Sequence, residues 1–78
     1  MEERRMSVVQ VTQDVRAKAQ GALEASPISV LRDLRVDCDG DSIRISGHVD
    51  TFYHKQLAQE AVLAVAKGTQ VVNSVAVE

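Results

Sequence analysis

Residues 34–49 read Leu-Arg-Val-Asp-Cys-Asp-Gly-Asp-Ser-Ile-Arg-Ile-Ser-Gly-His-Val, and this stretch decides the fold. Apolar and polar residues alternate, the chain reverses at Asp39-Gly40, and the alternation resumes. Such a pattern is typical of a β-hairpin with one buried face. A helical pattern lies on each side of the hairpin, so the hairpin sets the order of the remaining elements.

The segments that flank the hairpin each predict an amphipathic helix. Before it, apolar residues recur every three or four positions from Val8 to Leu23, and the helix is expected to end at Ser26-Pro27 because the residue before proline avoids helical angles. Gly21, inside this helix, predicts a close packing contact. After the hairpin, a helix is expected from about Phe52, with Asp50 or Thr51 as its N-cap and Gly68 past its end. Its predicted core stripe comprises Tyr53, Leu57, Ala61, Ala64 and Val65, widened by Ala58 and Val62.

Three strands are expected, over residues 34–38, 42–49 and 70–77, and Ile28–Asp33 is expected to be a connector with Ile28 and Leu31 under the fold. The element order αββαβ predicts an α+β fold, a two-layer sandwich with two helices on one face of a three-stranded mixed sheet. The other face of the sheet is left for solvent or a partner. Residues 1–7 are expected to be a disordered lead-in, and residues 8–78 a single domain.

Composition excludes several classes of protein. The chain has 78 residues, a net charge of −2 and one cysteine. The acidic balance disfavours nucleic acid as a partner, and a lone cysteine forms no internal disulfide. No run approaches the roughly 20 apolar residues of a transmembrane segment. No signal peptide is visible, so the chain is interpreted as cytoplasmic, or as periplasmic or envelope-bound if a leader has been removed.

The element order and several local features resemble the BON domain, a small bacterial module of osmotically induced and nodulation-related proteins. The resemblance covers roughly Val11 to Val77, and its most specific part is Ile43-Arg-Ile-Ser-Gly-His-Val49. The other matching features are Ala22-Leu23, Ser26-Pro27, Leu34-Arg-Val-Asp, Asp39-Gly40 and Val71-Val-Asn-Ser-Val75. Lys67-Gly68 departs from the Gly-Val usual in the family. The resemblance implies a non-catalytic module that binds phospholipid surfaces, other envelope components or small ligands.

The residues give no pattern of an enzyme or a metal site. By strand parity Cys38 faces the core and His48 the opposite side, so the two form no nucleophile–base pair, and Cys38 is expected to be buried and inert. Carboxylates at alternate positions from Asp37 to Asp41 resemble the start of a calcium-binding EF-hand loop. The glycine, however, comes at the fourth position, and the twelfth is His48 rather than glutamate. No cofactor is expected.

Basic residues mark the candidate binding surfaces. With Asp39-Gly40 as a two-residue loop, Arg35 lies opposite Arg44 and His48 shares their face, which suits an anion. With a loop from Asp39 to Ser42, Asp37 lies opposite Arg44 instead, and both registers keep the apolar face intact. On the first helix, Arg16 and Lys18 could meet anionic headgroups. The candidate binding residues are Arg16, Lys18, Arg35, Arg44 and His48.

These observations favour a non-enzymatic binding module that attaches to an anionic phospholipid surface or a protein partner. The alternative is a soluble domain that senses a small ligand or an ion such as potassium. Self-association is also open, because Val72 and Ala76 fall on the uncovered face. Of the consecutive aromatics Phe52 and Tyr53, one is expected to pack inward and the other to lie nearer the surface.

Overall fold

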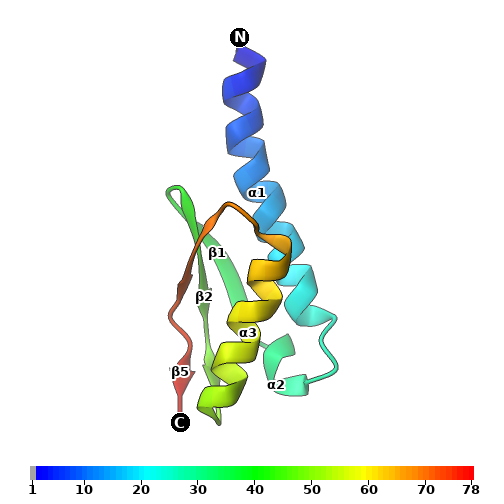
Figure 1. The fold of residues 1–78 in the computed structure, drawn as a ribbon, viewed down its shortest axis with the longest axis vertical. Coiled ribbons are helices and arrows are strands. Elements are labelled where there is room, and N and C mark those ends of the chain that lie inside the picture. Colours follow the sequence, from blue (N-terminus) through cyan, green and yellow to red (C-terminus); the bar gives the residue numbers. More distant parts are fainter. Residues whose placement is uncertain (1) are drawn as a thin grey trace.

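The computed structural model describes the backbone of residues 2–78 and the side chains of residues 13–78. Its helices are α1 (Glu2–Glu24), α2 (Ser29–Arg32) and α3 (Phe52–Val65), and its strands are β1 (Arg35–Asp39), β2 (Ser42–Ser46), β3 (His48–Val49), β4 (Gln70–Asn73) and β5 (Ala76–Val77). Figure 1 shows the two expected layers, with the helices on one side of the strands. The α+β sandwich predicted from the sequence is confirmed, with α2 added inside the expected connector.

The strands form one continuous mixed sheet. β1 pairs antiparallel with β2, β2 pairs parallel with β4, and β3 pairs parallel with β5. Between the two parallel pairs the ladder is not interrupted, because Ser74 N donates to Ile45 O at 2.8 Å and Ala76 N donates to Gly47 O at 2.9 Å. The three strands expected from the sequence are therefore present, two of them with a break at the middle.

The hairpin has the second of the two predicted registers. Asp37 is the partner of Arg44, and Asp39 is the partner of Ser42, so the loop is Gly40-Asp41. Gly40 has a φ of 65°, and no residue other than glycine has a positive φ among those described. A positive φ at the first loop position alone matches a type II′ turn, which favours glycine at that position. The Arg35–Arg44 opposition of the first register does not occur.

The core lies between the sheet and the two long helices. Alternate strand residues Val36, Ile43 and Ile45 are almost fully buried, and Leu23 and Val62 meet them from α1 and α3. Each such side chain contributes about 1.5–3 kcal/mol relative to exposure. As predicted, Leu31 is buried and Ile28 packs against the core from the connector.

The first helix is only partly as expected. Its stripe is confirmed where side chains are described, with Ala19 and Leu23 buried, whereas Val8 and Val11 lie outside the described side chains. The helix begins at Glu2 rather than near Val8, and the expected disorder of residues 1–7 stays a prediction. The packing contact predicted for Gly21 is wrong, because a Cβ at this exposed position would meet nothing within 4 Å.

On α3 the buried side is not the predicted core stripe but its flank, where the residues expected only to widen the stripe lie. The buried residues are Ala58 and Val62, followed by Ala66 at the C-cap, while Tyr53 and Val65 are exposed. Apolar side chains occur on most sides of this helix, so periodicity alone does not choose the buried side. The predicted Thr51 N-cap is confirmed, since its hydroxyl accepts a hydrogen bond from His54 N.

Cys38 is exposed, so the prediction of a buried cysteine is wrong. Strand parity did place it correctly on the side of Val36, and its partner across the hairpin is the fully buried Ile43. The residue nevertheless lies next to the hairpin end, beyond the part of β1 that the core encloses.

Candidate functional site

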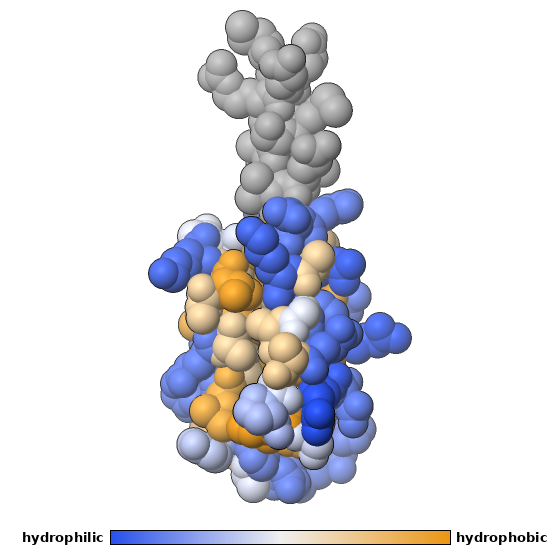
Figure 2. Space-filling view, turned by 90° about the vertical axis from the view of Figure 1, so that its right-hand side faces the viewer, coloured by the Kyte–Doolittle hydropathy of each residue, from blue (hydrophilic) through white to orange (hydrophobic). Residues whose placement is uncertain are grey.

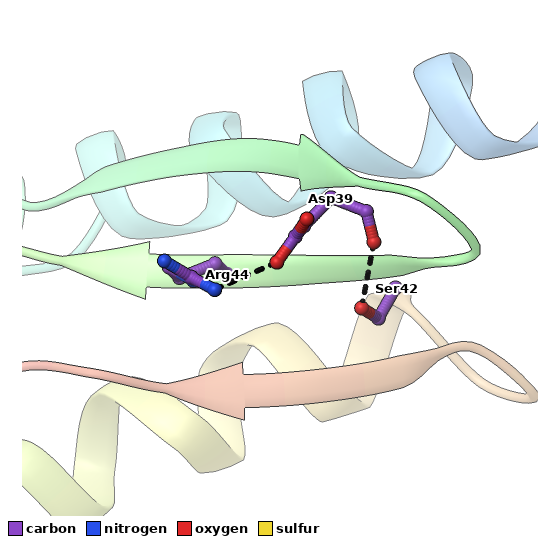
Figure 3. Close-up of polar contacts among 3 residues, drawn as sticks. All are labelled: Asp39, Ser42 and Arg44. Carbon is purple, nitrogen blue, oxygen red and sulfur yellow. Dashed lines mark hydrogen bonds and ion pairs between the residues drawn. The ribbon is translucent and has the colours of Figure 1, made fainter.

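The uncovered face of the sheet carries charges of both signs. Arg44 Nη2 donates to Asp39 Oδ2 at 2.7 Å, and Ser42 Oγ donates to Asp39 O at 2.9 Å (Figure 3). Both side chains of the ion pair are about half exposed, so the pair contributes at most about 1 kcal/mol. It does, however, neutralise one of the two arginines on this face.

Arg35 and His48 are the remaining predicted binding residues on that face, and both are exposed. Arg35 forms no ion pair with any residue of the described range 13–78, and its partner across the hairpin is Ser46. His48 follows Ser46 by two positions, so it lies diagonally from Arg35 on the same side of the sheet. The structure therefore leaves one arginine and one histidine of this face open to a ligand.

The two predicted binding residues of α1 are both engaged within the chain. Arg16 Nη1 donates to Val36 O at 3.1 Å, which turns the guanidinium toward β1. Lys18 Nζ lies 3.8 Å from Asp14 Oδ2, with both side chains largely exposed. The structure thus places the five predicted residues on two separate surfaces, and the role of each in binding stays a prediction.

The first turn of α3 presents two neighbouring aromatic side chains to solvent. Phe52 and Tyr53 are each 68% exposed, so the prediction that one of them packs inward is wrong. Lys55 Nζ lies 5.9 Å from the centroid of the Phe52 ring, within range of a cation–π interaction. This helix end lies at the same end of the molecule as the C-terminus and β5 (Figure 1).

A histidine and a carboxylate fix the chain just before these aromatics. His54 Nδ1 lies 2.9 Å from Asp50 Oδ1, and the His54 ring contacts the Tyr53 ring at a centroid distance of 5.9 Å. The hydrogen bond with His54 is the main cause that holds the pKa of the Asp50 carboxyl below its ordinary value. The aromatic pair therefore stands on a helix end held by both a side-chain cap and the hydrogen bond between Asp50 and His54.

A family model of the BON domain matches residues 10–78. The chain belongs to the BON domain family. This assignment confirms the resemblance inferred from the hairpin, and the BON family is one of binding-type domains. Comparison with curated proteins and with solved structures gave no significant match.

Two polar residues of this BON domain connect its layers in a way that sequence reasoning missed. Gln20 bonds through its side-chain amide to two backbone groups at the start of β1, Leu34 O at 2.9 Å and Val36 N at 2.8 Å. Asn73 donates to Lys55 O at 3.0 Å and accepts from Val75 N at 3.2 Å. The side chains of Gln20 and Asn73 both satisfy backbone groups. The one sequence signal was the four-residue spacing of Arg16 and Gln20, which places these two residues on the same flank of α1.

The helical side of this BON domain is apolar along its centre. Figure 2 shows apolar side chains gathered there, with hydrophilic residues around them. Partly buried residues of the helices and of the α1–α2 connection pack against the core, namely Val15, Ile28, Val30, Leu57 and Ala61. Within residues 13–78 no group of three or more His, Cys, Asp or Glu side chains could hold a metal. No helix among the described residues has the length and apolarity of a membrane span.

Proposed function

We propose that this BON domain is a non-enzymatic module that docks on an anionic phospholipid surface through the first turn of α3. The observation that carries the proposal is the pair Phe52 and Tyr53, each 68% exposed on a capped helix end. Tyrosine is enriched at the boundary between headgroups and acyl chains because its ring combines an apolar body with a polar hydroxyl, and phenylalanine is common on the apolar face of helices that lie at this boundary.

The rings supply the apolar part of this interaction. Burying a whole phenylalanine side chain contributes about 1.5–3 kcal/mol, so transferring the exposed two-thirds of Phe52 from water yields about 1–2 kcal/mol. That corresponds to roughly a five- to thirtyfold change in partition for one ring. Because the helix end is already held by the Thr51 cap, insertion orders few additional groups.

The basic groups supply the electrostatic part. Lys55 lies against the Phe52 ring, and a basic residue near an anionic surface contributes about 1 kcal/mol. Arg35 and His48 lie on the uncovered sheet face rather than on the helix, so they define a second surface that a headgroup could reach. The net charge of −2 limits long-range attraction, and we therefore expect binding to be weak and sensitive to salt.

Sedimentation with vesicles tests this proposal. The chain is expected to sediment with vesicles that contain phosphatidylglycerol, to do so less at high salt, and to remain in solution with phosphatidylcholine alone. The variant Phe52→Ser/Tyr53→Ser is expected to lose at least about tenfold in partition. Leu63→Ser is the matched control, because Leu63 is an exposed apolar residue (41%) near the other end of the same helix.

Each outcome separates one interpretation from another. Loss of binding in Arg35→Ala and His48→Ala, with the aromatic variant unaffected, would move the contact to the sheet face. Equal losses in the aromatic variant and in Leu63→Ser would mean that apolar surface in general, not this helix end, drives sedimentation. Absence of binding at low ionic strength would overturn the lipid proposal and favour a protein partner. The ion-sensing alternative stays a prediction, and titration with potassium would show it directly.

A further inference from the structure

β1 is an edge strand, and three outward backbone groups near its start are already hydrogen-bonded to side chains of α1. The sheet order is β1-β2-β4, so one side of β1 has no neighbouring strand. In a strand the N–H and C=O of successive residues point to alternate sides, and here Leu34 and Val36 point away from β2. Gln20 and Arg16 of α1 bind these groups, with Gln20 Nε2 donating to Leu34 O, Val36 N donating to Gln20 Oε1, and Arg16 Nη1 donating to Val36 O.

These three bonds reproduce the ladder of a parallel neighbouring strand. In such a ladder, one residue donates to the carbonyl before its partner and accepts from the N–H after its partner. The Gln20 amide does both across Arg35, at 2.9 and 2.8 Å, and the Arg16 guanidinium takes the place of the next N–H donor at 3.1 Å. These two side chains of α1 thus take the hydrogen-bonding positions of an additional strand.

We propose that Gln20 and Arg16 form a latch that closes the β1 edge against pairing with a second copy of the chain. An open edge presents unpaired N–H and C=O groups, which other strands use as a template. The three groups held by the latch are among those that a pairing strand needs. The inference is independent of lipid binding, because it concerns the contact between α1 and β1, whereas the proposed lipid contact is made by the first turn of α3.

The sequence of β1 favours a second copy as the occupant once the latch is removed. In an antiparallel pair centred on Val36, Val36 N of each copy donates to Val36 O of the other. Arg35 of each copy then lies opposite Asp37 of the other copy, which gives two such pairs in the dimer. Neither Arg35 nor Asp37 forms an ion pair within residues 13–78, so both are available for this complementary pair.

The test compares the full chain with the variant Arg16→Met/Gln20→Met. Methionine keeps the aliphatic stem and the helix propensity but cannot make the three bonds. Gln13→Met/Lys18→Met is the matched control, because both residues are exposed on α1. Sedimentation velocity over a range of concentrations reports the mass, starting from the 8.5 kDa monomer. Hydrogen exchange at the Val36 amide reports whether this N–H is bonded.

In the parent chain and the control, protection of the Val36 amide is expected at every concentration. In the latch variant, this amide is expected to exchange at least about tenfold faster when dilute and to regain protection as the mass doubles. Adding Asp37→Arg or Arg35→Asp to the latch variant should abolish the homodimer. Mixing those two chains should restore a heterodimer, because each arginine again faces an aspartate.

A folded latch variant that stays monomeric with an unprotected Val36 amide would overturn the proposal, since α1 itself would then cover the edge. If the latch variant still forms a homodimer after Asp37→Arg or Arg35→Asp is added, the proposed strand register is wrong. If the double variant does not fold, Gln20→Met alone tests the exchange readout: Arg16 still holds Val36 O, so faster exchange of the Val36 amide is expected without a change in mass. Unfolding of both variants would also count against the latch, because the bonds would then be a condition of folding.

Discussion

Replacing Gly47 with alanine tests why this position between β2 and β3 holds glycine. Gly47 has a φ of 122°, a backbone conformation that residues with a side chain rarely adopt. A Cβ built there would lie 2.8 Å from Leu34 Cδ2 and 3.6 Å from Leu34 Cα. Leu34 is buried, at 1% exposure, so its side chain has little room to move away.

The expected cost has two parts. A non-glycine residue at positive φ loses about 1–2 kcal/mol, and overpacking a filled core costs about 1–3 kcal/mol. The contact involves the end of a leucine side chain, which can rotate in part, so we expect a total of about 2–4 kcal/mol. A domain of this size has a free energy of unfolding of about 4–12 kcal/mol. The substitution should therefore remove a large fraction of the stability.

Urea unfolding followed by far-ultraviolet circular dichroism measures this loss, with two other glycines as controls. Gly68 has a φ of 82° but open space around it, so Gly68→Ala should cost only about 1 kcal/mol. Gly21 lies in a helix with nothing within 4 Å, so Gly21→Ala should stabilise the protein by about 0.5–1 kcal/mol. The three alanines differ mainly in backbone angle and surroundings.

A double-mutant cycle with Leu34→Val isolates the steric part, because valine lacks the Cδ2 atom that the new Cβ meets. In that background Gly47→Ala should cost about 1 kcal/mol less than in the parent chain. If Gly47→Ala costs no more than Gly68→Ala, or if the Leu34→Val background leaves its cost unchanged, the reasoning from the Leu34 contact is wrong.

Three further substitutions follow from single contacts. Asn73→Ala should cost about 1–3 kcal/mol in urea unfolding, because it removes three hydrogen bonds and leaves backbone groups unpaired, whereas an exposed Gln13→Ala should be near neutral. Thr51→Ala should cost about 1 kcal/mol through loss of the helix cap, and Thr51→Ser should retain most of it; equal losses would exclude the cap. The lowered pKa of Asp50 means that its pair with His54 stabilises the fold above the unfolded-state pKa of about 3.9, and that this contribution disappears as the pH falls through the lower folded-state value. Asp50→Asn should remove that part of the acid dependence of the melting temperature, and an unchanged profile would contradict it.

The hairpin shows how far sequence reasoning reaches. Alternation identified Val36, Ile43 and Ile45 as the buried face, and all three are buried. It left two registers open because they differ by two residues, and a shift of two preserves every side chain's face. The structure has the register with Gly40 first in the turn and Arg44 bonded to Asp39. The observed register is consistent with glycine at the first turn position and with the Arg44–Asp39 ion pair, whereas hydrophobic patterning does not distinguish the two registers.

The candidate surfaces show where sequence reasoning ended. Basic residues were identified as possible binding groups, yet Arg16 reaches a backbone carbonyl of β1 and Arg44 reaches a carboxylate. The exposure of both Phe52 and Tyr53 could not be predicted, because the buried side of α3 is set by where α1 and the sheet meet it. Gln20 gave no sign of its role, since a polar residue beside an apolar stripe is usually a solvated one.

By itself, the sequence determined the family, the order of the elements and the buried face of the hairpin. These follow from local periodicity and from the demands of proline, glycine and capping residues, which act over a few positions of the chain. Only the tertiary structure decided the register, the rotation of α3 and the hydrogen bonds of Gln20 and Arg16 to the edge of β1. Those features depend on contacts between residues far apart in the chain, whose geometry exists only after the two layers have packed.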